Sequence, residues 1–232
     1  MDKLHLDQHI SRHFNEELEA IKTRMLEMGG RVEKQVADAV RALEDADSEL
    51  AETVIRREMD IDALEIQIDE ECATLIARRQ PAATDLRMVL AVSKTIRDLE
   101  RIGDEAKKIA KMAIKLSEEG SAPRGYVEIR HIGNGVRKML NDSLDSFARY
   151  DADSALATMR ADQQVDLDYK SALRELITYM MEDPRSISRV MNILWALRSL
   201  ERVGDHAKNI CEQIVYLVKG KDIRHGNAPE YQ

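Results

Sequence analysis

Two carboxylates spaced four residues apart occur in two related segments of this chain. The segment LERIGDEAK returns 101 residues later as LERVGDHAK, so Glu100 and Asp104 correspond to Glu201 and Asp205. Four residues of an α-helix advance by a net rotation of about 40°, which places each pair on one helix face. Carboxylate oxygens on one face can bind a hard cation or a basic partner.

A second pair with the same spacing precedes each of these segments. Glu58 and Asp62 align with Asp162 and Asp166 at a shift of 104 residues. If the helices that carry the two pairs pack antiparallel, four carboxylates meet in each half and must take up protons, basic partners or a cation. Oxygen donors suit Mg or Mn, and carboxylate-rich bundles also hold iron, so we expect a divalent metal, with Mg, Mn, Fe and Zn as candidates. The expected metal ligands are Glu58, Asp62, Glu100, Asp104, Asp162, Asp166, Glu201 and Asp205.

A solvated helix face is the other interpretation of these pairs. Acidic residues four apart are common on exposed helices, and the arginines and lysines of the repeated segment could neutralise them. The duplication on corresponding helices favours a metal or ligand contact. A glycine in mid-helix costs about 1 kcal/mol relative to alanine. The repeat of Gly103 as Gly204 therefore indicates that a neighbouring helix or a ligand approaches there.

Histidines give two weaker signals. His5, His9 and His13 are spaced four apart and could bind a metal, but no repeated carboxylate is near them in sequence, which favours surface residues. His206 replaces Glu105 of the first copy and either alters the second site or is a surface residue. The sequence has no nucleophile–base arrangement, glycine-rich phosphate loop or Glu-x-x-His motif. We therefore expect that the protein is not an enzyme.

The composition favours a helical, cytoplasmic protein. Charged residues make up 34% of the 232 residues and aromatic residues 4%, with only 4 prolines and 10 glycines. Long stretches without these helix breakers are typical of all-α proteins. The net charge of −8 and the interleaved basic residues argue against nucleic-acid binding. No apolar run reaches the length of a membrane span, no signal peptide is recognisable, and the two cysteines are isolated.

Breakers and capping residues divide the chain into six helical segments. We expect helices over about 7–43, 49–79, 84–117, 127–149, 154–181 and 184–219. The glycine pair 29–30 interrupts the first segment and either kinks the helix or merely weakens it. Residues 45–48 and 150–154 supply turns and N-caps, and Thr84 or Asp85 caps the third helix.

Short connections make successive helices antiparallel neighbours. The predicted fold class is all-α, with two tandem, sequence-related antiparallel three-helix bundles. Residues 1–118 form the first bundle, 119–125 a linker, 126–220 the second bundle and 221–232 a flexible tail.

At the doubled LERIGDEAKKIA and LERVGDHAKNIC element, the sequence resembles the PhoU family of bacterial phosphate-specific transport regulators. The segments ARRQPAATDLR at 77–87 and YLVKG at 216–220 support the resemblance, which covers nearly the whole chain. It implies two three-helix bundles, and some members carry multinuclear metal clusters on E(D)xxxD motifs. Those motifs fall here on the pairs 58–62, 100–104, 162–166 and 201–205, the first with glutamate where aspartate is usual.

The resemblance also implies a function. PhoU-like proteins are not enzymes but negative regulators of the phosphate-starvation (Pho) response that modulate phosphate uptake. The implied partners are the ATPase subunit of the phosphate ABC transporter and a membrane sensor histidine kinase. The chain would then reach the inner membrane only through these partners. We also expect a homodimer.

Two other functions are alternatives. A carboxylate-bundle protein that binds or buffers metal would use the same ligands, although the Glu-x-x-His pairs of di-iron oxidases are missing. A coiled-coil adaptor without metal would keep its regulatory activity when Glu100, Asp104, Glu201 and Asp205 are replaced by alanine.

Overall fold

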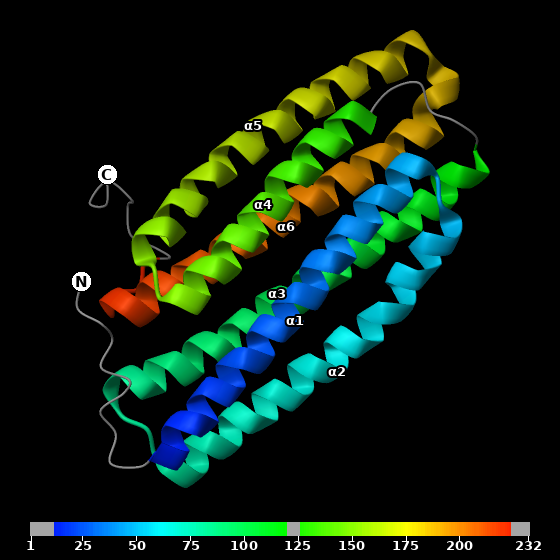
Figure 1. The fold of residues 1–232 in the computed structure, drawn as a ribbon. Coiled ribbons are helices and arrows are strands. Elements are labelled where there is room, and N and C mark those ends of the chain that lie inside the picture. Colours follow the sequence, from blue (N-terminus) through cyan, green and yellow to red (C-terminus); the bar gives the residue numbers. More distant parts are fainter. Residues whose placement is uncertain (1–11, 120–125, 224–232) are drawn as a thin grey trace.

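The computed structural model describes residues 12–119 and 126–223 and shows six long helices (Figure 1). They are α1 (Arg12–Asp45), α2 (Ser48–Arg79), α3 (Ala83–Glu118), α4 (Tyr126–Arg149), α5 (Ala152–Glu182) and α6 (Ile187–Lys219), with a short 3₁₀ helix η1 (Pro184–Ser186) before α6. These described residues contain no strand, and the predicted all-α class is confirmed. His5 and His9 lie outside the described residues, whereas His13 lies beside Glu16 and Glu17 on α1.

Capping chemistry sets the start of several helices. The Asp47 side chain accepts a hydrogen bond from the Leu50 amide at the start of α2, and Asp151 accepts from two amides at the start of α5. Both caps lie in the turns predicted from the sequence. The predicted cap of α3 is wrong, because Ala82 takes the extended N-cap conformation after the Gln80–Pro81 turn and makes no side-chain cap. The helix therefore begins earlier, and Thr84 and Asp85 lie inside its first turn.

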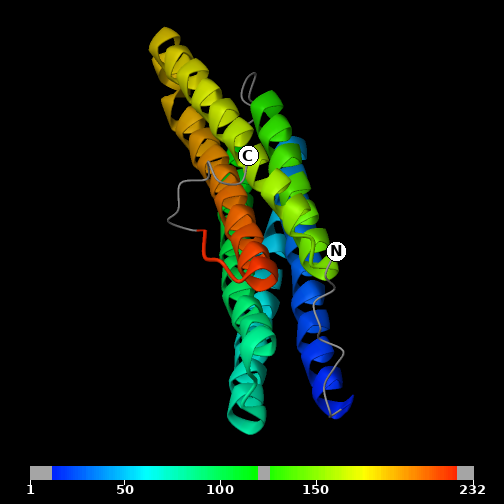
Figure 2. The same cartoon turned by 90° about the vertical axis from the view of Figure 1, so that its left-hand side faces the viewer.

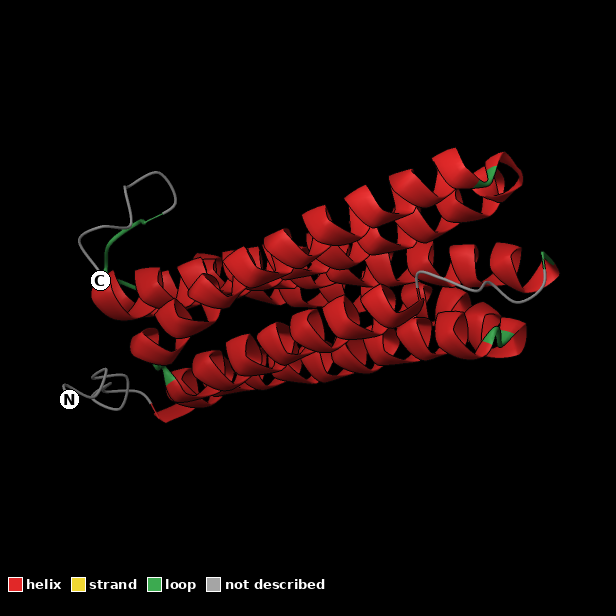
Figure 3. Cartoon of the chain, turned by 90° about the horizontal axis from the view of Figure 1, so that it is seen from above, coloured by secondary structure: helices red, strands yellow, loops and turns green. Residues whose placement is uncertain are grey.

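The two three-helix bundles pack side by side along their length. α3 and α6 lie at the centre, α2 packs beside α3, and α5 packs beside α6. α1 covers α2 and α3, α4 covers α5 and α6, and α1 also contacts α4. Figure 2 shows α1 and α4 together on one side of the molecule, and Figure 3 shows the helices running along one long axis. The halves thus share an extended interface.

Polar pairs cross the antiparallel contact between α3 and α6, which we call the seam. Arg202 of α6 lies 2.8 Å from Glu105 of α3, and His206 Nδ1 lies 2.9 Å from Asp98 Oδ1. Glu105 is only 2% exposed and also pairs with Lys108 at 3.0 Å. His206 of the second copy aligns with Glu105 and contacts Asp98 of α3. The two copies therefore contribute different side chains to the seam.

Two glycines bring α1 and α4 together. A Cβ atom on Gly29 would lie 2.5 Å from Leu144 Cδ2, and one on Gly133 would lie 3.1 Å from Val40 Cγ1. Gly133 and Leu144 each follow their counterparts Gly29 and Val40 by 104 residues, so the repeat relates the two contacts. The glycine pair 29–30 does not end the helix, since α1 is continuous there, and a weakening of the helix at this pair stays a prediction. A Cβ on Gly30 would meet nothing within 4 Å.

The apolar stripes of the helices fill both bundle cores. Met25, Leu99 and Phe147 are among the fully buried side chains. Cys72 and Cys211 are also buried and free, and burial raises the pKa of both thiols, that of Cys72 to about 12. Neither is a nucleophile near neutral pH, in line with a packing function. In the part of the chain that the structure describes, no helix is long and apolar enough to cross a membrane.

Candidate functional site

The structure brings the four predicted carboxylates of the first half together between α2 and α3. The charge of Asp62 acts on both Glu58 and Glu100, and Asp104 acts on the same two carboxyl groups. Glu58 is buried and accepts a hydrogen bond from the ammonium group of Lys107. We call this group of carboxylates the first cluster.

Burial is the largest cause that raises the pKa of Glu58 and of Glu100 in the first cluster. Like charges add to it: Asp62 raises the pKa of Glu58, and Asp104 raises the pKa of Glu100. Lys107 opposes the shift at Glu58 but does not reverse it. Burial and the neighbouring carboxylates thus both favour the neutral forms of Glu58 and Glu100.

The second cluster repeats this arrangement between α5 and α6. Lys208 Nζ donates to Asp162 Oδ2 at 2.7 Å, in the position of Lys107 beside Glu58. Burial is the largest cause that raises the pKa of Glu201, and the charge of Asp205 adds to it. The pKa of Asp205 is raised by burial and then by Asp162 and Asp166. Asp162 and Asp166 of α5 thus act on Glu201 and Asp205 of α6, so the structure brings all four predicted residues of this half together.

Glu65 is a fifth carboxylate of the first cluster that the sequence analysis missed. Its charge raises the pKa of Glu100, and its own pKa is raised by burial, with Asp69 and Asp62 adding to the effect against Arg97. The signal was present in the spacing, since Glu65 follows Glu58 by two helical turns on the same face. The second half has Tyr169 there, with the Arg198 guanidinium 5.9 Å from its ring centroid, so the clusters differ.

The repeated glycines lie beside neighbouring helices. A Cβ atom on Gly103 would lie 3.4 Å from Ile61 of α2, and one on Gly204 would lie 3.5 Å from Asp162 Oδ1 of α5. These are ordinary contact distances, so helix packing alone does not require glycine at either position. The predicted approach of a neighbouring helix is confirmed, and it occurs next to a cluster carboxylate in the second half.

The donor types of both clusters suit a hard cation, but their arrangement does not yet form a metal site. Glu201 Oε2 is buried without a hydrogen-bond partner and is therefore available as a ligand. Across residues 12–119 and 126–223, however, no three His, Cys, Asp or Glu side chains are grouped in a way that could hold a metal ion. Lys107 and Lys208 each donate a hydrogen bond to a cluster carboxylate. To bind an ion, this carboxylate would have to turn away from its lysine.

His206 does not belong to the second cluster. Its ring points across the seam to Asp98, which also accepts a hydrogen bond from Asn209 at 3.0 Å. Neither sequence interpretation of His206 is correct, because its side chain is mostly buried between the two halves. Helical spacing alone did not show which residues of α6 face α3.

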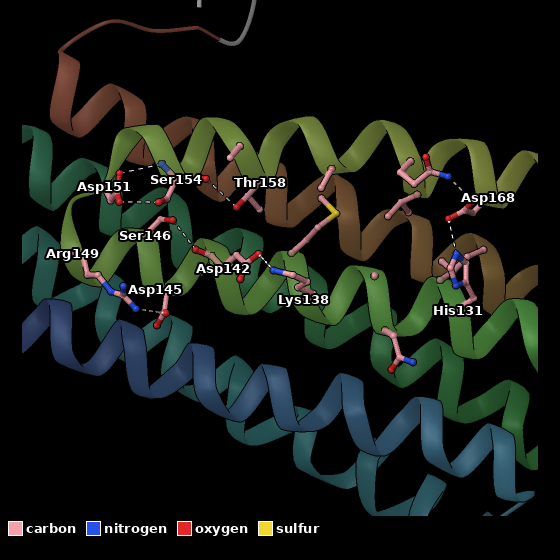
Figure 4. A pocket seen from close by; sticks show the side chains of 18 residues that line it. His131, Lys138, Asp142, Asp145, Ser146, Arg149, Asp151, Ser154, Thr158 and Asp168 are labelled. Carbon is pink, nitrogen blue, oxygen red and sulfur yellow. Dashed lines mark hydrogen bonds and ion pairs between the residues drawn. The ribbon is translucent and has the colours of Figure 1, made fainter. Parts of the chain in front are cut away.

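A groove with a cavity volume of about 790 Å³ lies between α4 and α5 (Figure 4). Small residues line part of the groove, among them Gly135, Ala157 and Ala161. Figure 4 shows the charged pairs that border it. These are Lys138–Asp142 at 2.5 Å, Arg149–Asp145 at 2.5 Å and His131–Asp168 at 3.1 Å.

The first bundle closes the corresponding position with a larger side chain. Ala161 aligns with Arg57, which donates to Asp38 at 2.9 Å and so bridges α1 and α2. The residue aligned with Asp38 is Asp142, which pairs with Lys138 of its own helix. A comparison of the two copies, position by position, would have indicated this groove from the sequence.

These features place the chain in the class of duplicated, carboxylate-rich helical bundles. The model of the PhoU domain matches residues 25–113 and 129–214. Over 225 residues, 97% of this chain and 93% of the relative, the sequence is 60% identical to the phosphate-specific transport system accessory protein PhoU homolog of Pseudomonas aeruginosa. It is 47% identical to the Escherichia coli protein PhoU of the same description over 230 residues, 99% of this chain and 95% of that one.

Solved structures agree with this assignment. The crystal structure of PhoU from Pseudomonas aeruginosa matches with a TM-score of 0.88 and 62% identity over 90% of this chain and 100% of that chain. The phosphate transport system regulatory protein PhoU from Streptococcus pneumoniae matches with a TM-score of 0.84 and 32% identity, over 90% and 98%. The chain belongs to the PhoU family.

Proposed function

We propose that this protein is a negative regulator of the phosphate-starvation response and a modulator of phosphate uptake. It would couple the ATPase subunit of a phosphate ABC transporter to a sensor histidine kinase on the cytoplasmic side of the inner membrane, without catalysing a reaction. The observation that carries this proposal is the 60% identity, over 97% of the chain, to an accessory protein of a phosphate-specific transport system.

The difference between the bundles suggests how one chain could serve two partners. The groove between α4 and α5 is open, whereas Arg57 bridges α1 and α2 at the aligned position. A regulator that binds one state of a kinase more tightly shifts the population of states by no more than that difference in affinity. A second contact with the transporter would raise the effective concentration at the kinase.

An amphipathic helix of a partner is the occupant that we propose for the groove. The groove follows two packed helices, and small residues such as Gly135 and Ala161 leave room for the side chains of a third helix. The lining contains more acidic than basic side chains: Asp142, Asp145, Asp151 and Asp168 against Lys138 and Arg149. The partner helix should therefore carry basic residues beside its apolar stripe.

A phosphate-starvation reporter in phosphate-rich medium tests the function and the groove together. We expect the reporter to fire in a host that lacks the gene and to be silenced by the wild-type chain. Ala161→Arg introduces the side chain that the first bundle has at the aligned position, Arg57. This arginine should fill the groove and raise reporter activity at least tenfold over wild type. Gln163→Arg, on the exposed side of α5 and outside the groove lining, should silence the reporter like wild type.

The outcomes separate the two proposals. A reporter that stays silent in the deletion host overturns the regulatory function. Silencing by Ala161→Arg at wild-type level overturns the groove as the docking site and leaves the regulatory function in place. Equal protein levels and equal melting temperatures of the two arginine variants exclude misfolding as the cause.

We also propose that each cluster binds a divalent cation in competition with its lysine. The residues that would hold it are the four carboxylates between α2 and α3, joined by Glu65, and the four between α5 and α6. Burial is the largest cause that raises the pKa of Glu100 and of Glu201, and a bound cation would neutralise the repulsion from neighbouring carboxylates that adds to it. This proposal also supports the alternative function of a metal-binding or metal-buffering protein, in which the deletion host would show no change in the reporter.

Thermal unfolding tests the cation proposal. Because the folded-state pKa values of Glu58, Glu100, Glu201 and Asp205 are raised, the fold binds more protons at these groups than the unfolded chain. The stability that these extra protons contribute is fully present below the carboxyl pKa values of the unfolded chain, near pH 4–4.5. It is lost as the pH rises through the raised pKa values of the folded chain. In chelator, we expect the melting temperature to rise as the pH falls from 7 towards 5.

At pH 7 a bound cation should raise the melting temperature, as protons do at lower pH. Mn²⁺ at about a hundredfold excess over its Kd would stabilise the fold by about 2–3 kcal/mol for each cluster and about 5 kcal/mol for both, a rise of roughly 10–20 °C. Replacing Glu100 and Glu201 by glutamine should raise the melting temperature in chelator and abolish most of the Mn²⁺ effect. A melting temperature at pH 7 that does not respond to Mg²⁺, Mn²⁺, Fe²⁺ or Zn²⁺ contradicts cation binding.

A further inference from the structure

A second cavity, with a volume of about 440 Å³, lies between α1 and α2 near the end of the bundle where α1 begins and α2 ends (Figure 1). Its size is typical of a small-molecule site. The buried part of its lining is apolar, since Ile21 and Leu75 are each only 5% exposed and Ala20 joins them. Charged side chains line the rest. The cavity shares no residue with the groove between α4 and α5 or with either carboxylate cluster.

Two ion pairs fix how α1 and α2 face each other around this cavity. Glu17 of α1 accepts two hydrogen bonds from Arg79 of α2, at 2.8 and 3.0 Å. Arg24 of α1 lies 2.6 Å from Glu71 of α2. Within each helix the two pairs are separated by about two turns, so they mark two ends of the cavity that lie about 10 Å apart along the helices.

The end of the cavity beside Glu17 has an excess of positive charge. The pKa of Glu17 is lowered, chiefly by the hydrogen bond from Arg79, and the charge of Arg78 contributes a smaller effect. Arg78 also lines the cavity and forms no ion pair with any residue that the structure describes. Because Arg79 already neutralises Glu17, the guanidinium group of Arg78 is available to an anionic group.

The opposite end has an excess of negative charge. Arg24 and Gln67 both donate to Glu71 Oε1, at 2.6 and 3.0 Å. The second oxygen, Glu71 Oε2, is buried without a hydrogen-bond partner, which costs free energy. Glu70 lines the same end and has no ion pair within residues 12–119 and 126–223. A cationic donor between these two carboxylates would pair with Glu70 and, after a small turn of the side chain, with Glu71 Oε2.

This distribution of charge argues against the simplest ligands. A metal ion would be repelled by the guanidinium groups of Arg24 and Arg78, and a phosphate would be repelled by three carboxylates. The two signs of charge lie at opposite ends, with the apolar side chains of Ile21 and Leu75 between them. The cavity therefore suits a molecule with a cation at one end, an anion at the other and an uncharged middle.

The second bundle does not repeat this charge pattern. The positions aligned with Arg24, Glu71 and Arg78 are all acidic there: Glu128, Glu175 and Glu182. Tyr179 aligns with Leu75, and its larger side chain packs partly buried against the core. Ends of opposite charge are thus a property of the first bundle alone.

We propose that this cavity binds a short peptide of two or three residues with free termini. The ammonium group of the peptide would lie between Glu70 and Glu71, and its carboxylate would pair with Arg78. Two or three extended residues span about 7–10 Å, which matches the distance between the two ends of the cavity. Small side chains of the peptide would contact Ile21 and Leu75. A bound peptide joins α1 to α2 and adds a ligand-binding activity to the proposed regulatory function.

Calorimetric titration of the full chain with trialanine tests the site. We expect saturable binding of one peptide per chain. Trialanine that is acetylated at its amino end or amidated at its carboxyl end loses one charge, so each form should bind at least tenfold more weakly. Glu70→Gln and Arg78→Gln should each weaken the binding of trialanine at least tenfold. Arg174→Gln, at the exposed position of α5 that aligns with Glu70, should bind trialanine like wild type.

Charge reversal at one end of the cavity is the decisive measurement. Arg78→Glu gives both ends a negative charge, as the second bundle has at the aligned positions. This variant should bind 1,7-diaminoheptane, which has an ammonium group at each end, at least tenfold more tightly than trialanine. Wild type should show the opposite preference. Leu75→Tyr, which introduces the side chain of Tyr179, should fill the cavity and abolish the binding of both compounds.

Three results overturn the proposal: a wild type that does not bind trialanine, capped peptides that bind as tightly as trialanine, and an Arg78→Glu variant that still prefers trialanine to the diamine. Misfolding does not explain a reversed preference, and circular dichroism of each variant confirms that it is folded. The reporter experiment does not depend on this cavity, so the failure of one proposal leaves the other in place.

Discussion

Valine at Gly29 is expected to lower the free energy of unfolding by about 2–3 kcal/mol, whereas alanine at the adjacent Gly30 is expected to raise it by up to about 1 kcal/mol. A Cβ atom at Gly29 would lie 2.5 and 2.9 Å from the two terminal carbons of Leu144, and the branched side chain of valine would drive α4 away from α1. At Gly30 the same atom meets open space, so only the helix preference of alanine remains. Urea unfolding followed by circular dichroism measures both changes.

A paired substitution identifies the cause of the Gly29 effect. Leu144→Ala should remove the clash, so the double variant Gly29→Val, Leu144→Ala should be more stable than the sum of the two single changes predicts. Additive effects would show that Gly29 matters for a reason other than its contact with α4. A destabilised Gly30→Ala variant would contradict the open space at that position.

Loss of the carboxylate of Glu105 is expected to cost about 2–4 kcal/mol, a large effect for a single residue. Glu105 is almost completely buried in the seam, where it pairs with Arg202 at 2.8 Å and Lys108 at 3.0 Å. Glu105→Ala leaves the guanidinium of Arg202 between the two halves without its partner. The measurement is again the free energy of unfolding, with the slope against denaturant as a check that both halves unfold together.

A surface pair and a double variant control this prediction. Asp145→Ala breaks the exposed i,i+4 pair with Arg149 and should cost less than about 0.5 kcal/mol. Glu105→Leu combined with Arg202→Leu removes both charges and should recover most of the loss. If Glu105→Ala costs no more than Asp145→Ala, the ion pairs of the seam do not hold the halves together.

The helices could be predicted because their ends depend on nearby residues. Asp47 and Asp151 cap α2 and α5, and Gln80 ends α2 with a left-handed backbone before Pro81. The glycine pair 29–30 was read as an interruption of the helix, but Gly29 lies at a packing contact with Leu144, and such a contact is remote in sequence. For the same reason the long seam between α3 and α6 could not be predicted from periodicity.

The carboxylate clusters were only partly predictable. The spacing of Glu100 and Asp104 placed them on one helix face, and the repeat indicated that this face mattered. The repeat also indicated that its lysines could neutralise the carboxylates, as Lys107 does at Glu58. Spacing does not give the register between helices, so the contact of His206 with Asp98 was not foreseen. Glu65 was not predicted because its counterpart in the second copy is Tyr169, so the repeat does not distinguish it from other acidic residues of α2.

The seam and the paired glycine contacts relate the halves as the subunits of a symmetric assembly are related. Gene duplication and fusion of a shorter three-helix chain that bound itself through this surface would produce such a molecule. In such a self-associating chain, every substitution would appear on both sides of the contact. Fusion would end that constraint, and one copy now has Arg57 and Glu105 where the other has Ala161 and His206. An ancestral surface used twice thereby became two surfaces on which selection could act separately.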